Sequence, residues 1–497
     1  MFELLGIPIW RVLDRIVCFL FVCVLVIGAK NKFFKKNQFN DDFTSLEVMK
    51  SIRGFAAMGV ILHHISQEYT FQESGVLTPF VNAGAYFVAV FFFCSGYGLI
   101  KSFDSKKDYL NGFIKKRIVK SIVVPFYVDV ILYGLFMFLV KIPLEKVQWV
   151  TNFLGITMMN TYAWFPIVLA LLYLVFFLCF RFISNRKVCF AIILIFMIAL
   201  GIGTCINGHF AWWAGPANWW MDDNFWETSF KWWMDEKIFW FHGEWWVNSA
   251  PAFLTGLIFA TYEQKIVPFF KKNYGRKFFI LLLITLGLYG LNQYGQSHFG
   301  YWTEFNMQGP EIGNKIVTYF CQIPLMFVFP FTVFIFLMKY HVSNPVTRFF
   351  GKYSLHTYLM NLCALTTLRF LSYNFEDSPF YLGGIYNNLL AYAIGVIILT
   401  VLLGVAEQKI TDKVQALLFT RRQRQKVVYS TAPRFMDDDA LKQIRKEEQL
   451  KEKEASERKS FEPEKDAEKA PEETEKAHEV ARSVKKAQSV KSKGKKK

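Results

Sequence analysis

The hydrophobic positions of this chain gather in long runs that recur through its first 410 residues, with polar segments between them. Runs near 20 apolar residues with few charges have the length that an α-helix needs to cross a lipid bilayer. The pattern predicts eleven such helices, near residues 7–29, 50–66, 80–101, 118–141, 162–183, 188–205, 247–262, 278–295, 316–340, 350–372 and 387–408. The predicted fold class is therefore all-α, a polytopic membrane helical bundle of about eleven transmembrane helices.

The positive charges alternate between the connecting segments. Lys and Arg cluster after the first, third, fifth, seventh and ninth predicted helices, whereas residues 67–79 and 373–385 contain neither. Loops rich in Lys and Arg stay on the cytoplasmic side of a membrane. We therefore expect a multi-pass protein of the inner (plasma) membrane, with its N-terminus outside and its C-terminus in the cytoplasm.

Three regions follow from these patterns. Residues 1–44 are expected to hold an N-terminal transmembrane helix and a basic linker, although a signal peptide would also show a charged start and a short apolar run. Residues 45–410 form the membrane domain. Residues 411–497 are expected to be a charged, largely disordered cytoplasmic tail, because so few apolar residues cannot offset the entropy of ordering. A tail that binds anionic lipid headgroups through its basic end, residues 491–497, is the alternative.

Charge and cysteine spacing argue against a nucleic-acid partner, a disulfide framework and a zinc site. The 497 residues carry a formal net charge of +17, which in a soluble protein would indicate nucleic acid. Here the basic residues alternate with apolar runs, so we expect membrane lipids and no nucleic acid as partners. The eight cysteines form no Cys-x-x-Cys pair, so neither a disulfide framework nor a zinc site is indicated.

The second predicted helix carries the most distinctive polar residues. Thr44 and Glu47 have the spacing of a capping box, so we expect the helix to begin there. Arg53 and His64 are eleven positions apart, which is about three turns and about 16 Å along the helix axis. They therefore share one face, with a cation near the cytoplasmic end and an imidazole deep in the membrane.

Ionisable side chains inside a bilayer are costly and usually functional. A neutral His accepts a proton from an attacking hydroxyl near pH 7, and an Arg binds phosphate. The pair Arg53 and His64 would thus suit an elongated CoA thioester. An anchoring role under the positive-inside rule is the alternative for Arg53. His63 lies about 100° around the helix from His64, so we expect it to be a packed or interfacial residue.

Further segments place this pair in a wider context. Residues 52–64, with Arg53-x10-His64, resemble the first signature of acyltransferase family 3, a family of integral membrane O-acyltransferases. Five segments similar to later family motifs follow in the family's order: residues 91–97 with Ser95-Gly96-Tyr97, residues 113–120 with Pro125, Trp164-Phe165 with Tyr173, residues 253–260, and residues 350–359. The resemblance covers about residues 45–410. It implies a core of ten helices, to which the first predicted helix is additional.

The resemblance also implies roles for individual residues. His64 would be the catalytic base that removes a proton from an acceptor hydroxyl as it attacks a thioester, with Arg53 as the second catalytic residue. The residues expected to hold the acyl donor are Arg53, Arg117, Lys120, Ser95 and Tyr97. Acetyl-CoA, or another acyl-CoA, would be a co-substrate and no cofactor would be bound permanently. A covalent acyl-enzyme stays open as an alternative.

The chain departs from the family pattern at two places. Asn361 stands where many members carry His. Leu169 and Ala170 stand where some sugar-modifying members carry paired Glu. The subclass of acceptor therefore does not follow from the resemblance.

Residues 208–246 carry ten of the fourteen tryptophans, with acidic residues among them. This segment is expected to face outward. One interpretation is an interfacial aromatic belt. The other is a platform for a carbohydrate acceptor, because indole faces pack on sugar rings and carboxylates accept hydroxyl hydrogen bonds. The residues singled out for acceptor binding are Trp219, Trp220, Asp222 and Asp223.

These observations favour a membrane O-acetyltransferase that modifies a cell-surface polysaccharide or its lipid-linked precursor. A glycan transporter or flippase would also use intramembrane charges and aromatic platforms, but such proteins typically contain internal repeats, and no clear repeat relates the two halves. A membrane sensor or scaffold is a third hypothesis, and it predicts that His64 and Arg53 are dispensable.

Overall fold

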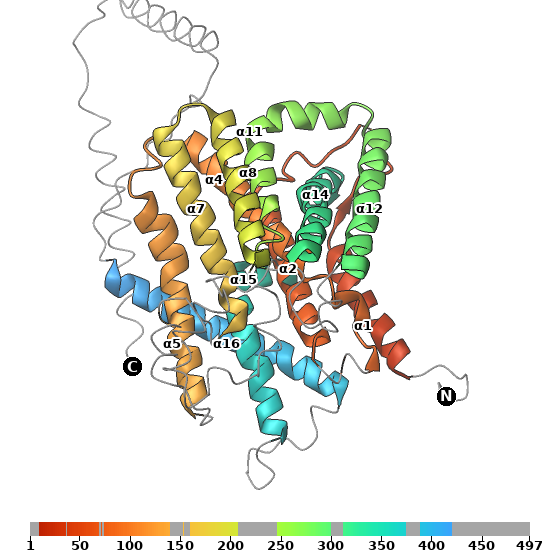
Figure 1. Cartoon of the computed structure of the whole chain (residues 1–497). Helices are drawn as coiled ribbons and strands as arrows, with labels where there is room; N and C mark the ends of the chain where they lie inside the picture. Colours follow the sequence, from red (N-terminus) through yellow and green to blue (C-terminus); the bar gives the residue numbers. More distant parts are fainter. Residues whose placement is uncertain are drawn as a thin grey trace, which may run out of the picture. The chain divides into compact units, whose positions relative to one another are not determined.

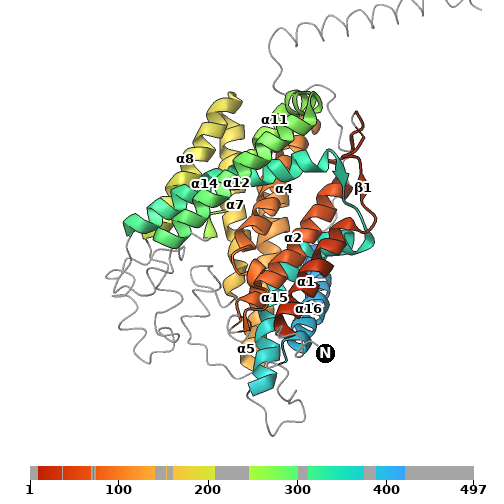
Figure 2. The same cartoon turned by 90° about the vertical axis from the view of Figure 1, so that its right-hand side faces the viewer.

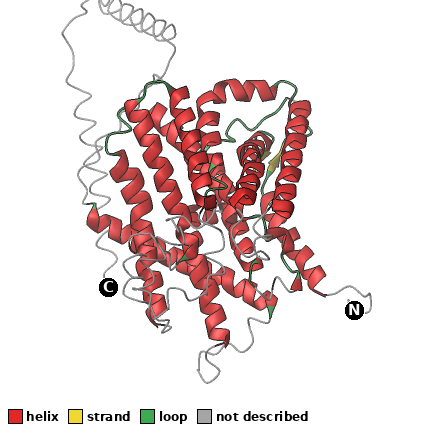
Figure 3. Ribbon diagram, viewed as in Figure 1, coloured by secondary structure: helices red, strands yellow, loops and turns green. Residues whose placement is uncertain are grey.

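The structure, a computed structural model, is almost entirely helical. It describes residues 9–35, 37–68, 71, 74–139, 153, 160–206, 246–299, 312–373 and 388–419. The chain divides into two units, Met1–Pro433 and Arg434–Lys497, and all of the described residues belong to the first. Within the described ranges the strands amount to one short pair (Figure 3). The acceptor residues expected at 219–223 and the charged tail from 420 onward lie outside the described residues.

Among the described residues, eleven long α-helices lie over the eleven predicted apolar runs (Figure 1). They are α1 (Ile9–Val26), α2 (Leu46–Ser66), α4 (Gly84–Ser105), α5 (Val124–Leu139), α7 (Trp164–Phe182), α8 (Arg186–Ile206), α11 (Pro251–Lys271), α12 (Tyr274–Phe299), α14 (Ile312–Leu337), α15 (Pro345–Tyr373) and α16 (Leu389–Leu418). The shorter helices are η2 (Thr78–Phe80), η3 (Ile114–Val123, a π-helix continuous with α5) and η4 (Thr161–Ala163).

Length and composition make the chain a helical membrane protein. Among the described residues, seven helical segments are long and apolar enough to cross a membrane: α4, η3 with α5, α7, α8, α12, α14 and α16. The other four helices, α1, α2, α11 and α15, are shorter in their apolar part or carry more polar residues. The number of eleven membrane spans therefore stays a prediction.

Several helices extend beyond their apolar runs. The run near 247–262 predicts the first part of α11, which continues to Lys271 past a kink at Tyr262 (φ −108°, ψ 15°). Likewise α16 continues to Leu418, past residue 410, where the sequence pattern placed the boundary of the membrane domain. An apolar run marks the part of a helix that suits lipid, whereas backbone hydrogen bonding continues into polar surroundings.

The segments rich in Lys and Arg contact one another at one end of the bundle. The contacts are the antiparallel pairing of β1 (Lys30–Asn31) with β2 (Tyr340–His341), Lys271 Nζ to Asp41 Oδ1 (2.7 Å), Arg186 Nη2 to Asp104 Oδ1 (2.6 Å) and Arg181 Nη1 to Asn111 Oδ1 (3.4 Å). We call this end, formed by residues 27–45, 104–113, 181–186, 271–273 and 338–344, the basic face. The hydrogen bond and charge of Lys271 hold the pKa of Asp41 below its usual value. If the charges alternate between successive loops, the segments rich in Lys and Arg must lie at the same end of the bundle, as they do here. The side of the membrane that the basic face occupies stays a prediction.

Two pairs of glycines allow close helix crossings. A Cβ on Gly54 of α2 would collide with the Thr347 carbonyl oxygen of α15, and one on Gly351 of α15 would collide with the Lys50 carbonyl oxygen of α2. Gly96 of α4 and Gly256 of α11 approach each other's helices in the same way. Small residues allow membrane helices to pack backbone against backbone where no hydrophobic driving force exists between them. All four glycines belong to the segments that resemble family motifs.

Helix α1 packs into the bundle beside α2 and α16 (Figure 2). The ring of Phe21 stacks on that of Phe55 in α2 at 4.2 Å between centroids. Asn344 Nδ2, at the start of α15, donates to the carbonyl oxygens of Val24 (2.7 Å) and Ile27 (3.2 Å). These contacts join both the middle and the end of α1 to the helices that carry the predicted site.

Candidate active site

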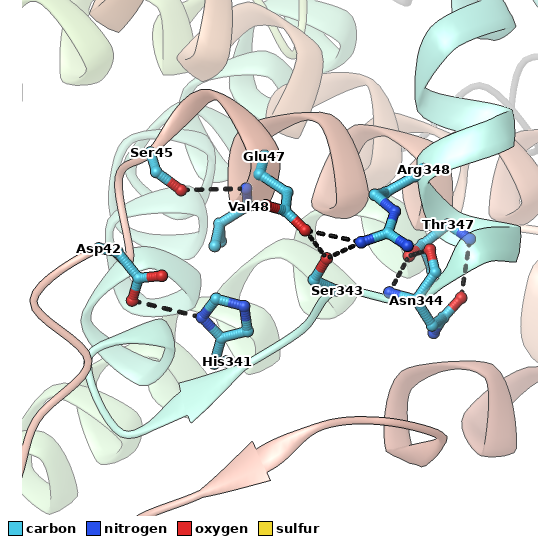
Figure 4. Close-up of polar contacts among 9 residues, drawn as sticks. All are labelled: Asp42, Ser45, Glu47, Val48, His341, Ser343, Asn344, Thr347 and Arg348. Atoms are coloured by element: carbon cyan, nitrogen blue, oxygen red, sulfur yellow. Dashed lines mark hydrogen bonds and ion pairs between the residues drawn. The ribbon is translucent and has the colours of Figure 1, made fainter.

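Helix α2 begins one residue later than the capping-box spacing predicts (Figure 4). Its N-cap is Ser45, whose hydroxyl accepts a hydrogen bond from the Val48 backbone N–H at 3.3 Å. The two residues predicted to cap each other bind elsewhere. Thr44 Oγ1 donates to Glu263 of α11 (2.9 Å), and Glu47 Oε1 accepts from Arg348 of α15 (2.7 Å). The predicted start of the helix is therefore off by one residue. The capping box itself does not form, because residues of α11 and α15 bind the two side chains.

The starts of α2 and α15 are joined at the basic face (Figure 4). Glu47 Oε1 accepts hydrogen bonds from Ser343 Oγ (2.6 Å) and from Arg348. These hydrogen bonds hold the pKa of Glu47 below its ordinary value, and the one from Ser343 has the larger effect. Asn344 caps α15, since its Oδ1 accepts from the Thr347 N–H at 2.9 Å. This arrangement fixes where α2 and α15 begin relative to each other.

His64 lies near the opposite end of α2 and is buried, with 7% of its surface exposed. Its Nδ1 is 2.7 Å from Oδ1 of Asn361 in α15. Asn361 Nδ2 in turn donates to Thr400 Oγ1 of α16 at 3.0 Å, and both residues are fully buried. The ring of Tyr162, just before α7, stacks on the His64 ring at 3.7 Å between centroids. Three helices and one ring therefore hold the imidazole in place.

This geometry selects one tautomer of His64. Asn361 Nδ2 donates to Thr400, which leaves Oδ1 facing His64. In this orientation of the amide, the contact requires a proton on Nδ1 of a neutral ring, because an amide oxygen only accepts hydrogen bonds. Nε2 then carries a lone pair, and among the described residues no hydrogen bond reaches it. A neutral imidazole with its other nitrogen fixed is the arrangement of a general base.

His63 has a different environment. Its Nδ1 is 2.8 Å from the Phe80 carbonyl oxygen of η2, and the residue is partly buried. A Cβ on Gly84 of α4 would collide with its ring. The structure thus directs the two adjacent histidines to different neighbours, His64 toward α15 and His63 toward α4 and η2.

Arg53 faces a polar group between α2, α4 and α7. Its Nε donates to the Met49 carbonyl oxygen at 3.3 Å. The Tyr173 hydroxyl of α7 interacts with Arg53, with Arg117 of η3 and with Ser95 of α4. Three of the residues expected to hold the acyl donor therefore interact with Tyr173, and Arg117 also donates to Ser102 Oγ at 3.3 Å. Two guanidinium groups beside a hydroxyl suit an anionic phosphate.

The other two residues expected at the donor site lie apart from this group. The Tyr97 hydroxyl donates to Glu263 Oε2 at 3.0 Å, and Lys101 pairs with the same carboxylate. Lys120 Nζ stands over the ring of Phe419 at 5.9 Å from its centroid. Ser95 and Tyr97 are two positions apart on a helix and so point in nearly opposite directions. Tyr97 faces α11, and Lys120 faces the end of α16.

The chain belongs to acyltransferase family 3. A family model described as an acyltransferase domain matches residues 46–406, which is more than half of the chain. The protein is therefore a membrane acyltransferase. No curated protein and no solved structure gives a significant match. The matched range begins at the first residue of α2 and ends within α16.

The structure adds Asn361, Tyr162 and Thr400 to the candidate site. Asn361 stood out in the sequence only as a departure from the family pattern, and nothing there linked it to His64. The two residues are 297 positions apart, and the α2–α15 packing brings them together. Asn160, which donates to the buried carboxylate of Asp129 at 2.8 Å, also accepts from the Tyr162 N–H at 3.1 Å.

Proposed function

We propose that this protein transfers an acetyl group from acetyl-CoA to a hydroxyl of a cell-surface polysaccharide or of its lipid-linked precursor. The observation that carries the proposal is the fixed His64 ring, in a chain that belongs to acyltransferase family 3. Nδ1 is bound to Asn361, Tyr162 stacks on one ring face, and Nε2 is free of protein partners among the described residues.

In this proposal the CoA thioester enters from the basic face. Its phosphates bind Arg53 and Arg117 near Tyr173, and its thioester extends along α2 toward His64. His64 Nε2 removes the proton of the acceptor hydroxyl as the hydroxyl oxygen attacks the thioester carbonyl carbon. The CoA sulfur leaves when the tetrahedral intermediate collapses, and the resulting imidazolium retains its hydrogen bond to Asn361.

The experiment compares His64→Gln with His63→Gln in cells that make the surface glycan. Both variants replace an imidazole with an amide on the same helix, so His63→Gln controls for altered packing. Ester-linked acetate on the isolated glycans is measured by mass spectrometry at matched amounts of folded protein in the membrane. We expect acetate with wild type and with His63→Gln, and none with His64→Gln.

Two other results would each remove part of the proposal. If His64→Gln acetylates like wild type, His64 is not the base. If wild type itself yields no ester on the glycan, the acceptor or the acyl group differs from the one proposed, and lipid and other hydroxyl acceptors are tested next with the same pair of variants.

A further inference from the structure

A second buried polar cluster lies between α5, α15 and α16, where these three helices pack together. It contains Glu407 of α16, Asp129 of α5 and His356 of α15. Both carboxyl side chains are fully buried, at 0% exposure, and His356 is 8% exposed. His356 precedes Asn361 by five residues on α15, so it lies about 8 Å nearer the basic face than the residue that holds His64.

Glu407 has one close contact, with His356, and no hydrogen-bond partner among the described residues. His356 Nδ1 is 3.0 Å from Glu407 Oε2, but the orientation does not make a hydrogen bond. Neither Glu407 oxygen has a hydrogen-bond partner among the described residues. A charged group left unpaired in a low-dielectric interior costs several kcal/mol, so such a group takes up a proton instead.

Asp129 differs from Glu407 in this respect. Asn160 Nδ2 donates to both of its oxygens, at 2.8 and 3.0 Å, which stabilises a charged carboxylate. Asp129 and Glu407 also repel each other electrostatically. Two carboxylates that share a buried site do not both ionise. The pair of Glu407 and Asp129 therefore holds at least one proton, and His356 from α15 is the other titratable group that faces Glu407 in the described part of the chain.

The cluster connects to His64 on one side. Asn160, which binds Asp129, accepts from the N–H of Tyr162, whose ring stacks on His64. The centroid of the Tyr358 ring is 6.3 Å from that of the His64 ring, and the Tyr358 side chain is buried. The Tyr358 hydroxyl interacts electrostatically with Asp129. Tyr358 thus lies beside the His64 ring and also interacts with Asp129.

The other side of the cluster leads toward the basic face. His356 interacts electrostatically with Asp412, one turn beyond Glu407 on α16 and exposed. Chains of Asp, Glu and His within a membrane are typical of proton pathways. Glu407 itself lies just beyond the residues matched by the family model, 46–406.

We propose that Glu407, with Asp129 and His356, forms a proton-binding site that exchanges protons between His64 and the basic face. The link to His64 rests on the proposed function. As the acceptor oxygen bonds to the acyl carbon, its O–H bond breaks and the proton moves to His64 Nε2, then to the cluster. The C–S bond breaks, and the CoA thiolate takes one proton from water at the basic face, where the cluster releases one. The proton count is thereby balanced.

Infrared spectroscopy tests the site without reference to activity. The full-length protein in lipid nanodiscs is titrated with acid, and the carbonyl-stretch band of protonated carboxyl groups, which shifts in D2O, is recorded. We expect a band in wild type that Glu407→Gln removes. Glu263→Gln is the matched control, because Glu263 is bound by Tyr97, Thr44 and Lys101 and should leave the band unchanged.

A carboxyl band that Glu407→Gln leaves intact would overturn the proposal. If Glu407→Gln does not fold, Asp129→Asn provides the same comparison, because removing the negative neighbour shifts the titration of the Glu407 band to lower pH. An unshifted band in Asp129→Asn would equally contradict the site.

Kinetics then tests the connection to His64. In Glu407→Gln we expect a loss of kcat on the order of tenfold, smaller than the 10²–10⁴-fold contribution of a direct acid–base group. The KM for the acyl donor should not change, and the pH profile of kcat should lose one ionisation, which Glu407→Asp restores. An unchanged pH profile of kcat would show that the cluster takes no part in catalysis. Inactive wild type would instead refute the proposed function and leave the infrared result standing.

Discussion

Replacing Asn361 with Leu isolates the hydrogen bond that orients His64. The two side chains have similar size, so the α2–α15 packing is largely kept, but Leu accepts no hydrogen bond. His64 Nδ1 and the Thr400 hydroxyl, previously 2.7 and 3.0 Å from the amide, then lose their partners in a buried site. Without this acceptor the His64 ring turns or moves its proton to Nε2, and both changes remove the base.

The size of the effect follows from that lost contact. A buried polar group without a partner costs about 1–3 kcal/mol, which is the energy that now favours the wrong ring state. Since about 1.4 kcal/mol corresponds to a factor of ten in rate, we expect kcat to fall about 5- to 150-fold. The KM for the acyl donor should not change, because Arg53 lies about 16 Å away along α2.

The assay is the initial rate of acyl transfer as a function of acyl-CoA concentration, with purified full-length protein. Asn361→His is the control, because its ring nitrogen still accepts a hydrogen bond from Nδ1, and it should lose less activity than Asn361→Leu. Wild-type kcat in Asn361→Leu would refute the role of Asn361 and the tautomer assigned to His64. A change in KM alone would indicate a donor-binding role instead.

Two further predictions concern the fold. Gly54→Ala should destabilise the protein by about 1–3 kcal/mol, because the added Cβ meets the Thr347 carbonyl oxygen. Gly98→Ala is the control and should be neutral or slightly stabilising, because its Cβ meets nothing within 4 Å. Equal thermal unfolding midpoints for the two variants would contradict the close crossing at Gly54. The folded-state pKa of Glu47 lies below its ordinary 4.5, so its contacts with Ser343 and Arg348 stabilise the fold above that value and are lost as the pH falls through the lowered pKa. The unfolding midpoint of wild type should therefore drop faster than that of Glu47→Gln below about pH 4.5, and parallel curves would show that Glu47 does not contribute.

The position of a helix over each apolar run could be predicted from the sequence because lipid imposes a simple requirement. Each apolar run must satisfy its backbone hydrogen bonds internally, so a helix over each run is nearly obligatory. The ends were less predictable. Arg348 lies within α15, although the predicted helix began at residue 350 and Arg348 was counted in the connecting segment, because helical hydrogen bonding does not depend on hydrophobicity. The π-helix η3 likewise has no distinct hydrophobic signature.

The candidate site was predictable only along a single helix. Helical geometry relates Arg53 to His64 because both lie on α2, but it says nothing about contacts between α2, α15 and α16. Asn361 and Thr400 became identifiable only once the packing was known, since each meets a partner on another helix. At Thr44 and Glu47 the local pattern was misleading. Its spacing suggested that the two residues cap the helix together, but their side chains bind residues of α11 and α15 instead.

We expect the crossing of Gly54 and Gly351 near the basic face to set the geometry at His64 as well. Gly351 and Asn361 are ten residues apart on α15, so a tilt of about four degrees at the crossing moves Asn361 by about 1 Å. A displacement of that size breaks the 2.7 Å contact with His64, and a 1 Å misplacement can cost about 10²-fold in rate. Gly351→Ala should therefore lower kcat in the fraction of protein that remains folded, where every catalytic side chain is still present. Unchanged kcat per folded molecule would mean that the Asn361–His64 contact does not depend on this crossing.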